Sequence, residues 1–137
     1  MKRLILTSFE EAVASLREAV DAKIPETSLL FVTLHRDAVI QRFEYTFEMA
    51  CKMMKRSIEI EAGRSEVDDL FSKKDLFRRA MEAGLISDPE RWFAYLLARN
   101  ETSHAYDKEK AKNVYQQAIR FLPDVEDLLE RLKKRYE

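Results

Sequence analysis

The sequence predicts an all-α protein, folded as an antiparallel up-and-down bundle of four to five helices. Glycine and proline are scarce, with 2 and 3 among 137 residues, so the chain offers few places for loops. Charged residues make up 36% and hydrophobic residues 46%, a balance typical of soluble helical proteins. A chain of this length buries about two-thirds of its unfolded surface in one core. We therefore expect a single domain over residues 1–137.

The first helix is predicted from a capping-box pattern that precedes one apolar face. In Ser8-Phe9-Glu10-Glu11 a hydroxyl residue comes three positions before a carboxylate, which is typical of a helix start. Helical spacing then gives one buried face, made of Phe9, Val13, Leu16 and Val20. The helix should stop before Pro25.

A longer second helix carries apolar residues on two faces. Thr27 or Ser28 can cap its start, it runs to about Ala62, and Gly63 is its natural stop. One face is a normal core stripe, made of Val39, Ile40, Phe43, Phe47, Ala50, Met54 and Ile58. The other face, roughly 180° to 280° around the helix, holds Phe31, Leu34, Tyr45, Met49 and Met53. Such a helix lies at the centre of a bundle, or its second face forms an oligomer interface, and both can hold.

Three carboxylates lie at the border between these two faces: Asp37, Glu44 and Glu48. At that border they either form a solvated acidic edge or meet a buried arginine from another helix. The sequence supports both interpretations.

Two shorter helices follow a polar connection. Ser72 is typical of the cap of a short helix, which should end at Gly84. Asp88 caps the next helix, with Pro89 in its first turn, where the missing N–H costs nothing. The apolar stripe of that helix comprises Trp92, Phe93, Leu96 and Leu97. We expect Trp92 to anchor the bundle and not to stack on a nucleic-acid base.

A last helix begins at Asp107 and is strongly amphipathic. Its apolar face comprises Ala111, Val114, Tyr115, Ala118, Ile119 and Leu122, and then Val125, Leu128, Leu129 and Leu132. Pro123 lies within this pattern and should kink or restart the helix, because proline cannot donate a helical hydrogen bond.

The residues that can carry chemistry gather between the last two helices. Arg99, His104 and Tyr106 supply a fixed cation, a group that titrates near neutral pH and a phenolic hydroxyl. On an unbroken helix Arg99 and His104 would lie roughly 140° apart, so one shared pocket requires a bend. Residues 102–103 and Asp107 carry side-chain oxygens that can cap a new helix start after such a bend.

Composition and motifs exclude several kinds of function. The net charge of -1 gives no bulk positive field for nucleic acid, although a local basic patch is compatible with RNA. Cys51 is alone and cannot form an intramolecular disulfide, which indicates a reducing cytoplasm. There is no zinc-site spacing and no Gly-rich phosphate loop, and the apolar run 4–6 is far too short to span a membrane. We expect a cytoplasmic protein without a metal or a cofactor.

Two stretches are recognisable together. The first is residues 36–48, RDAVIQRFEYTFE. The second, residues 83–106, contains Gly84-Leu85-Ile86, Trp92, Arg99-Asn100 and Ser103-His104-Ala105-Tyr106. In matching order over most of the chain, they resemble the nucleotidyltransferase substrate-binding family of the HEPN superfamily. The most specific part of the resemblance is the signature of Arg, four residues, His, one residue and Tyr.

The resemblance implies a helical bundle, usually dimeric, that is the partner of a minimal nucleotidyltransferase. Related HEPN proteins with this signature are toxins of toxin–antitoxin modules: metal-independent ribonucleases that are silenced when the partner adds AMP to the motif tyrosine. The resemblance thus implies Arg99 and His104 as the cleavage pair and Tyr106 as the modified residue. Asn100 would orient Arg99 or the phosphate. The alternative is a non-catalytic subunit that presents a nucleotide or another substrate to the transferase.

The chemistry of these residue types fits RNA cleavage. Without a metal, cleavage needs the ribose hydroxyl deprotonated, the leaving oxygen protonated and the phosphate charge stabilised. His104 can transfer a proton near pH 7, and Arg99 can bridge two phosphate oxygens. One histidine per motif leaves a second acid or base missing, so we expect a homodimer that brings two motifs together. Without the resemblance, Arg99 would be a salt-linked residue and His104 a helix cap.

Overall fold

The computed structural model describes residues 3–62 and 72–137, and over these ranges the chain contains helices and no β-strand. The α-helices are α1 (Thr7–Asp21), α2 (Leu29–Ala62), α3 (Lys73–Glu82), α4 (Pro89–Asn100) and α5 (Lys108–Tyr136). A short 3-10 helix, η2 (Thr102–His104), lies between α4 and α5. The predicted all-α bundle is confirmed.

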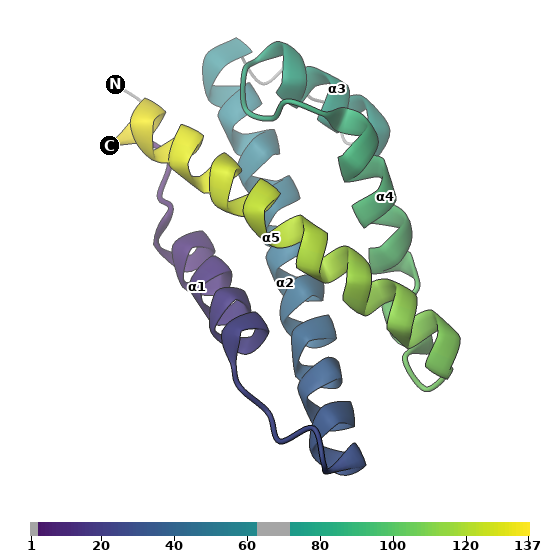
Figure 1. Ribbon diagram of the computed structural model, residues 1–137. Coiled ribbons are helices and arrows are strands. Elements are labelled where there is room, and N and C mark those ends of the chain that lie inside the picture. Colours follow the sequence, from purple (N-terminus) through teal and green to yellow (C-terminus); the bar gives the residue numbers. More distant parts are fainter. Residues whose placement is uncertain (1–2, 63–71) are drawn as a thin grey trace.

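Helix α2 lies at the centre of this bundle (Figure 1). It contacts every other α-helix of the described chain, with α1 along one side and the α3–α4 pair along the other. Helix α5 crosses α2 and also packs against α1 and α4. The central position accounts for one part of the second apolar face, because Met53 is buried and Met49 is half-buried. The part in the first half of α2, with Phe31, Leu34 and Tyr45, is exposed.

The core stripe predicted for α2 is confirmed, because all seven of its residues are buried. An aromatic cluster packs around the middle of this stripe and is centred on Trp92 of α4. The Trp92 ring lies 6.2 Å from Phe47 of α2, 5.8 Å from Phe77 of α3 and 5.4 Å from Phe121 of α5, measured between ring centroids. Such aromatic pairs contribute about 0.5–1.5 kcal/mol each beyond their burial. Trp92 is 2% exposed and therefore anchors the bundle, as predicted.

Most of the predicted helix starts are confirmed by side-chain hydrogen bonds. Ser28 Oγ accepts from the backbone N–H of Phe31, and Ser72 Oγ accepts from that of Asp75. Asp88 and Asp107 each accept two backbone N–H groups at the first turns of α4 and α5. These caps satisfy donors that a helix start leaves free, which is why they could be read from local sequence. Gly63, the predicted stop of α2, lies outside the described residues.

The predicted capping box of the first helix is wrong. Helix α1 begins at Thr7, two residues earlier than a cap at Ser8 requires, and Leu6 occupies the cap position without a side-chain hydrogen bond. Leu4 and Leu6 are both buried in the core, at 7% and 4% exposure. Burial of these two leucines fixes the entry of the chain into α1, so tertiary packing overrides the local signal at Ser8.

Two predictions on α4 and α5 also need correction. Leu97 is 66% exposed, because the face that α4 buries carries Trp92, Tyr95 and Ala98. Helix α5 continues through Pro123 to Tyr136, so the predicted restart is wrong, while the predicted kink stays a prediction. Pro123 is on the exposed side of α5, so the turn around it stays helical while the buried side keeps its packing.

The last turns of α5 are fastened to the turn between α3 and α4. Gly84 has a φ of 78°, the left-handed conformation that ends a helix and favours glycine. Arg131 donates to the carbonyl of Gly84 over 3.1 Å and to Ser87 Oγ over 2.6 Å. Arg135 donates to the carbonyl of Ala83 over 2.7 Å. These arginines satisfy carbonyls that the end of α3 leaves free.

Candidate functional site

The predicted bend between α4 and α5 is present and is formed by η2. Thr102 is buried, and its hydroxyl donates to the carbonyl of Arg99 over 2.8 Å. The backbone N–H of His104 donates to the carbonyl of Glu101 over 2.9 Å, and that of Asp107 to the carbonyl of His104 over 3.0 Å. Thr102 thus satisfies a free carbonyl at the end of α4, whereas we expected it to cap the start of a new helix. We call residues 99–106 the motif turn.

Arg99 lies at the end of α4 and is half-buried, with 34% of its side chain exposed. Its Nε donates to Oε1 of Glu48 over 2.6 Å, which joins the motif turn to the middle of α2. Among the residues that the structure describes, Glu48 accepts from this one nitrogen of the guanidinium group. The two terminal nitrogens, Nη1 and Nη2, are therefore available for the two oxygens of a phosphate.

The three carboxylates at the border of the α2 faces have different surroundings. Glu48 meets the arginine. Asp37 and Glu44 instead line a groove of about 400 Å³ beside η2, together with Gln41, Tyr45 and parts of the motif turn. Neither of these two carboxylates forms an ion pair within the described ranges. The sequence left two interpretations open for these carboxylates. Glu48 contacts an arginine from another helix, whereas Asp37 and Glu44 form an acidic edge.

His104 and Tyr106 lie close together on the outer side of the motif turn. Their ring centroids are 6.1 Å apart, with the rings edge to face at 69°. His104 is half-buried, whereas Tyr106 is 84% exposed. Asn100 is exposed at the last position of α4. The motif turn therefore presents an accessible phenol beside an imidazole, on a backbone that η2 holds in a fixed shape.

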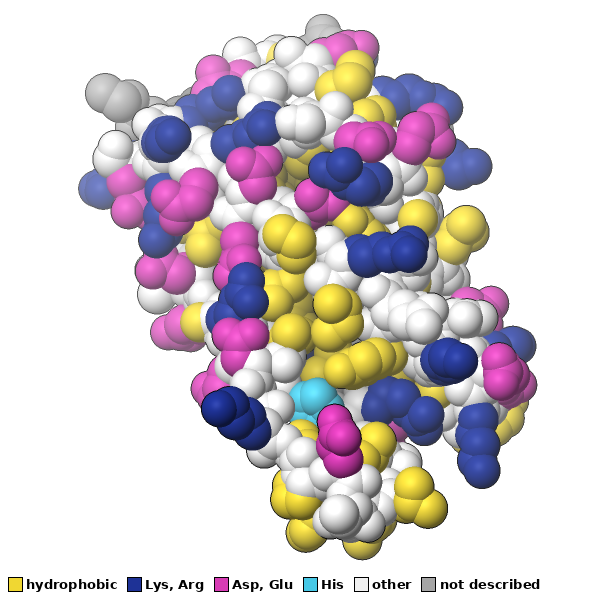
Figure 2. Space-filling view, in the orientation of Figure 1, with side chains coloured by type: hydrophobic (Ala, Val, Ile, Leu, Met, Phe, Trp, Pro, Cys, Tyr) yellow, Lys and Arg dark blue, Asp and Glu magenta, His cyan; other side chains and the backbone are white. Residues whose placement is uncertain are grey.

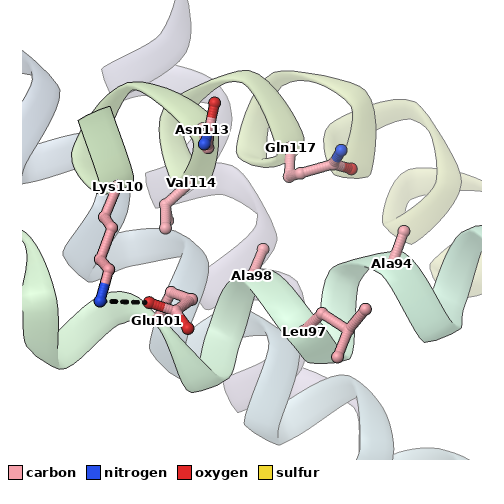
Figure 3. A pocket seen from close by; sticks show the side chains of 8 residues that line it. All are labelled: Ala94, Leu97, Ala98, Glu101, Lys110, Asn113, Val114 and Gln117. Carbon is pink, nitrogen blue, oxygen red and sulfur yellow. Dashed lines mark ion pairs between the residues drawn. The ribbon is translucent and has the colours of Figure 1, made fainter.

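A second groove runs between α4 and α5, on the side of Glu101 (Figure 3). It has a volume of about 420 Å³ and is lined by Ala94, Leu97, Ala98, Glu101, Lys110, Asn113, Val114 and Gln117. An ion pair of 3.6 Å between Lys110 Nζ and Glu101 Oε2 closes one end. Glu101 Oε2 is buried and has no hydrogen-bond donor among the described residues. This groove was not predicted from the sequence, although Lys110, Asn113 and Gln117 have the spacing of one helix face.

Cys51 does not take part in this chemistry. It is 5% exposed, and burial raises the pKa of its thiol to about 12, with Glu48 acting in the same direction and Lys73 against it. A thiol with such a pKa is not a nucleophile at neutral pH. Cys51 is thus a small apolar residue of the core.

The described part of the chain contains neither a cluster of metal ligands nor a membrane-spanning helix. Within residues 3–62 and 72–137, no group of three or more His, Cys, Asp or Glu side chains could hold a metal ion. No helix in these ranges is long and apolar enough to cross a membrane.

The bundle and its motif turn define an all-α protein with a bend between its last two helices, and the family is given by comparison with known families. Residues 4–134 match the family described as nucleotidyltransferase substrate binding protein like. The chain therefore belongs to the nucleotidyltransferase substrate-binding family.

Individual relatives are similar in sequence and in structure. The probable ribonuclease HepT of Haemophilus influenzae is 44% identical over 96 residues, which are 70% of this chain and 66% of that protein, just under two thirds of its length. A solved Haemophilus influenzae structure, described as the fold of a substrate binding domain of a nucleotidyltransferase, has a TM-score of 0.84 at 34% identity and covers 94% of this chain and 99% of that one. A solved protein from Thermus thermophilus has a TM-score of 0.74 at 29% identity, over 91% and 98% of the two chains.

Proposed function

We propose that this protein is a metal-independent endoribonuclease and the partner of a minimal nucleotidyltransferase, which silences it by adding AMP to Tyr106. The observation that carries the proposal is the motif turn, where Arg99 is fixed by Glu48 and His104 lies beside an exposed Tyr106. The similarity to a probable ribonuclease and to a substrate binding domain of a nucleotidyltransferase supports both halves of it.

In the proposed cleavage, each side chain has one role. His104 takes the proton of the ribose 2′-hydroxyl or gives one to the leaving 5′-oxygen. Arg99 uses Nη1 and Nη2 to hold two phosphate oxygens and to stabilise the charge that develops on them. Asn100, exposed at the same helix end, contacts the phosphate or Arg99 when RNA is bound.

In the proposed silencing reaction, the Tyr106 hydroxyl attacks the α-phosphate of ATP on the transferase. An O–P bond forms at the phenolic oxygen, pyrophosphate leaves, and the phenolic proton passes to a base of the transferase. The exposure of Tyr106, 84%, supports access by an enzyme of that kind. The added phosphate carries negative charge next to His104, so it competes with the phosphate of RNA.

We further propose a homodimer, in which the partner subunit supplies the second acid or base. The exposed apolar residues at the beginning of α2 support it: Leu29, Leu30, Phe31, Val32 and Leu34 are between 41% and 84% exposed. Figure 2 shows hydrophobic side chains gathered at the end of the molecule where α2 begins. Exposed apolar patches of this kind on a soluble protein mark interaction surfaces.

The test uses the purified chain without any transferase. It is incubated with tRNA and mRNA in EDTA, beside His104→Ala and Arg99→Ala. We expect cleavage by the wild type and a loss of at least about a hundredfold in either variant. Absence of cleavage by the wild type, or full activity of His104→Ala, overturns the ribonuclease proposal.

The second candidate is a non-catalytic subunit that presents a nucleotide to the transferase. The groove between α4 and α5 supports this candidate, because Asn113 and Gln117 offer amide groups to a base while Val114 and Leu97 provide apolar walls. Calorimetry with ATP and the purified chain separates the two candidates. Binding that Asn113→Ala weakens, together with no RNA cleavage, favours the presenting subunit.

The remaining features of the proposal follow from the same role. We propose one domain over residues 1–137, a cytoplasmic location where RNA and the transferase are present, and no requirement for a metal or a cofactor. One hydrophobic core shared by the described helices supports the single domain.

A further inference from the structure

A basic groove lies on α2 beside the start of α3, on residues that the proposed cleavage does not use. It has a volume of about 480 Å³ and is lined by Glu48, Met49, Cys51, Lys52, Lys55, Lys73 and Leu76. Three lysines from two helices thus meet in one concave surface. We call this surface the lysine groove.

The lysine groove is positively charged although the whole chain has a net charge of -1. Apart from Lys55, its described walls carry two lysines, Lys52 and Lys73, and one carboxylate, Glu48, whose charge is already paired with Arg99. Lys52 and Lys73 form no ion pair with any carboxylate in the described ranges. A concave surface with unpaired cations attracts an anion, and its apolar walls strengthen the field inside it.

The position of the groove indicates which anion it attracts. Glu48 lines the groove with one part of its side chain and holds Nε of Arg99 with its carboxylate. Glu48 therefore links the lysine groove to Arg99, the residue that would hold the reacting phosphate. An RNA strand is a polyanion with a phosphate at every nucleotide, so its neighbouring phosphates have to lie on surfaces next to Arg99. The groove beside η2 that Asp37 and Glu44 line has two carboxylates and no lysine or arginine among its described lining residues, so it repels these phosphates.

We propose that the lysine groove binds the backbone phosphates of single-stranded RNA on one side of the cleaved bond. This inference rests on the proposed ribonuclease function. Lysine ammonium groups are compact point charges that contact phosphates without reading bases. The groove would thus raise affinity for RNA of any sequence, because its lysines contact phosphates and its described lining contains no aromatic side chain on which a base could stack.

The first test measures binding in the absence of cleavage. A His104→Ala background is titrated with fluorescein-labelled single-stranded RNA of mixed sequence, and anisotropy is recorded over a range of KCl concentrations. We expect Lys52→Gln/Lys73→Gln to weaken binding by about tenfold and to reduce the slope of log K against log salt by about 1.4, since each phosphate contact contributes about 0.7. Lys52→Arg/Lys73→Arg keeps the charge and should bind within about twofold of the parent.

The matched control removes two exposed lysines that do not line the groove, Lys23 and Lys134. Lys23→Gln/Lys134→Gln changes the net charge by the same amount and should leave the affinity and the salt slope within about twofold of the parent. Equal losses in the control and in the groove variant overturn the inference, because the effect would then come from net charge alone. Thermal unfolding of each variant shows that the fold is kept.

The second test measures cleavage in the wild-type background. Here Lys52→Gln/Lys73→Gln should raise KM by about tenfold with little change in kcat, because the lysines bind RNA and do not touch the reacting atoms. If the wild type cleaves and the groove variant cleaves with an unchanged KM, the inference fails and the ribonuclease function stands. If the wild type does not cleave, the ribonuclease function fails, while the anisotropy test still decides whether the groove binds RNA.

Discussion

Nε of Arg99 lies 2.6 Å from Oε1 of Glu48, and this contact joins two residues 51 positions apart in the chain. It fixes the guanidinium group by one nitrogen, and the structure shows no hydrogen bond from the other two to a described residue. A planar group held in this way is oriented for a ligand before the ligand arrives.

The first prediction is that Glu48→Ala lowers RNA cleavage by about tenfold to a hundredfold, because Arg99 loses its orientation. The free energy of unfolding should change by less than about 1 kcal/mol, since both side chains are partly exposed. Initial rates on a labelled RNA and urea unfolding measure the two effects. Glu44→Ala is the control, because Glu44 has no arginine partner in the described chain. Unchanged cleavage by Glu48→Ala would show that the ion pair has no part in the site.

The second prediction concerns Tyr106. After coexpression with the nucleotidyltransferase, intact mass should increase by one or more AMP groups for the wild type and not for Tyr106→Phe. Because Tyr106 is 84% exposed, the substitution should change stability by less than about 0.5 kcal/mol. Tyr45→Phe is the comparison, since Tyr45 is also exposed but its hydroxyl is hydrogen-bonded to Ser15. A mass increase that persists in Tyr106→Phe contradicts this prediction. Its loss in Tyr45→Phe would then place the modification at Tyr45.

The third prediction concerns Tyr95, whose hydroxyl donates to Asp124, a carboxylate that Arg91 also holds through two hydrogen bonds of 2.9 Å. Burial, and then the bond to Asp124, raise the pKa of Tyr95 well above its ordinary value. Tyr95→Phe should lower the free energy of unfolding by about 1 kcal/mol at neutral pH. Since folding holds the phenolic proton, this contribution is present below the ordinary tyrosine pKa of about 10 and is lost as the pH rises above it.

The measurement is urea unfolding of the wild type and of Tyr95→Phe at a series of pH values. The difference between the two should be constant from pH 7 to about pH 9 and should then shrink, because the unfolded wild type loses the proton more easily than the folded one. A difference that grows above about pH 10 contradicts the assigned direction of the pKa shift.

The fourth prediction is that Cys51 is unreactive in the folded protein. With a pKa of about 12 caused by burial, its thiolate fraction at pH 8 is on the order of 10⁻⁴. A thiol-specific reagent should label the native protein slowly and the protein in guanidinium within minutes. The sequence has one cysteine, so the signal needs no further assignment. Rapid labelling of the native protein would show that this part of the core opens.

The fifth prediction tests the proposed dimer. Phe31→Asp together with Leu34→Asp should convert a dimer into a monomer in size-exclusion chromatography with light scattering, because charges would replace apolar contacts. Both side chains are 52% exposed in the single chain, so thermal unfolding of the monomer should be preserved. Ile5→Asp is the control at an exposed position outside α2. A wild-type monomer would count against the paired-site mechanism.

The fold could be predicted from the sequence wherever local chemistry decides it. Asp88 and Asp107 mark their helix starts because a carboxylate satisfies free backbone donors within the same turn. The start of α1 could not be predicted in this way, because it depends on the burial of Leu6 against residues far along the chain. Leu97 was misplaced because α4 buries the face that carries Trp92, Tyr95 and Ala98, which the apolar pattern did not select.

The candidate site was predicted in part. The resemblance identified Arg99, His104 and Tyr106 as site residues, and their roles stay predictions. Spacing alone could not select Glu48 from three carboxylates on one edge, because the choice depends on how α4 packs against α2. The lysine groove was not anticipated, since it forms only when α3 packs against α2 and brings residue 73 next to residue 52.

The arginine contacts from α5 to the turn after α3 have a consequence for synthesis on the ribosome. Residues 99–106 leave the exit tunnel before α5, yet Phe121 completes the aromatic cluster and residues 131–135 close the turn at 83–87. The arginine contacts span 44 to 52 positions, and they cannot form while α5 is still inside the tunnel. In the nascent chain the bundle around the motif turn therefore stays incomplete until α5 has left the tunnel. The candidate site can assemble only after α5 has been translated.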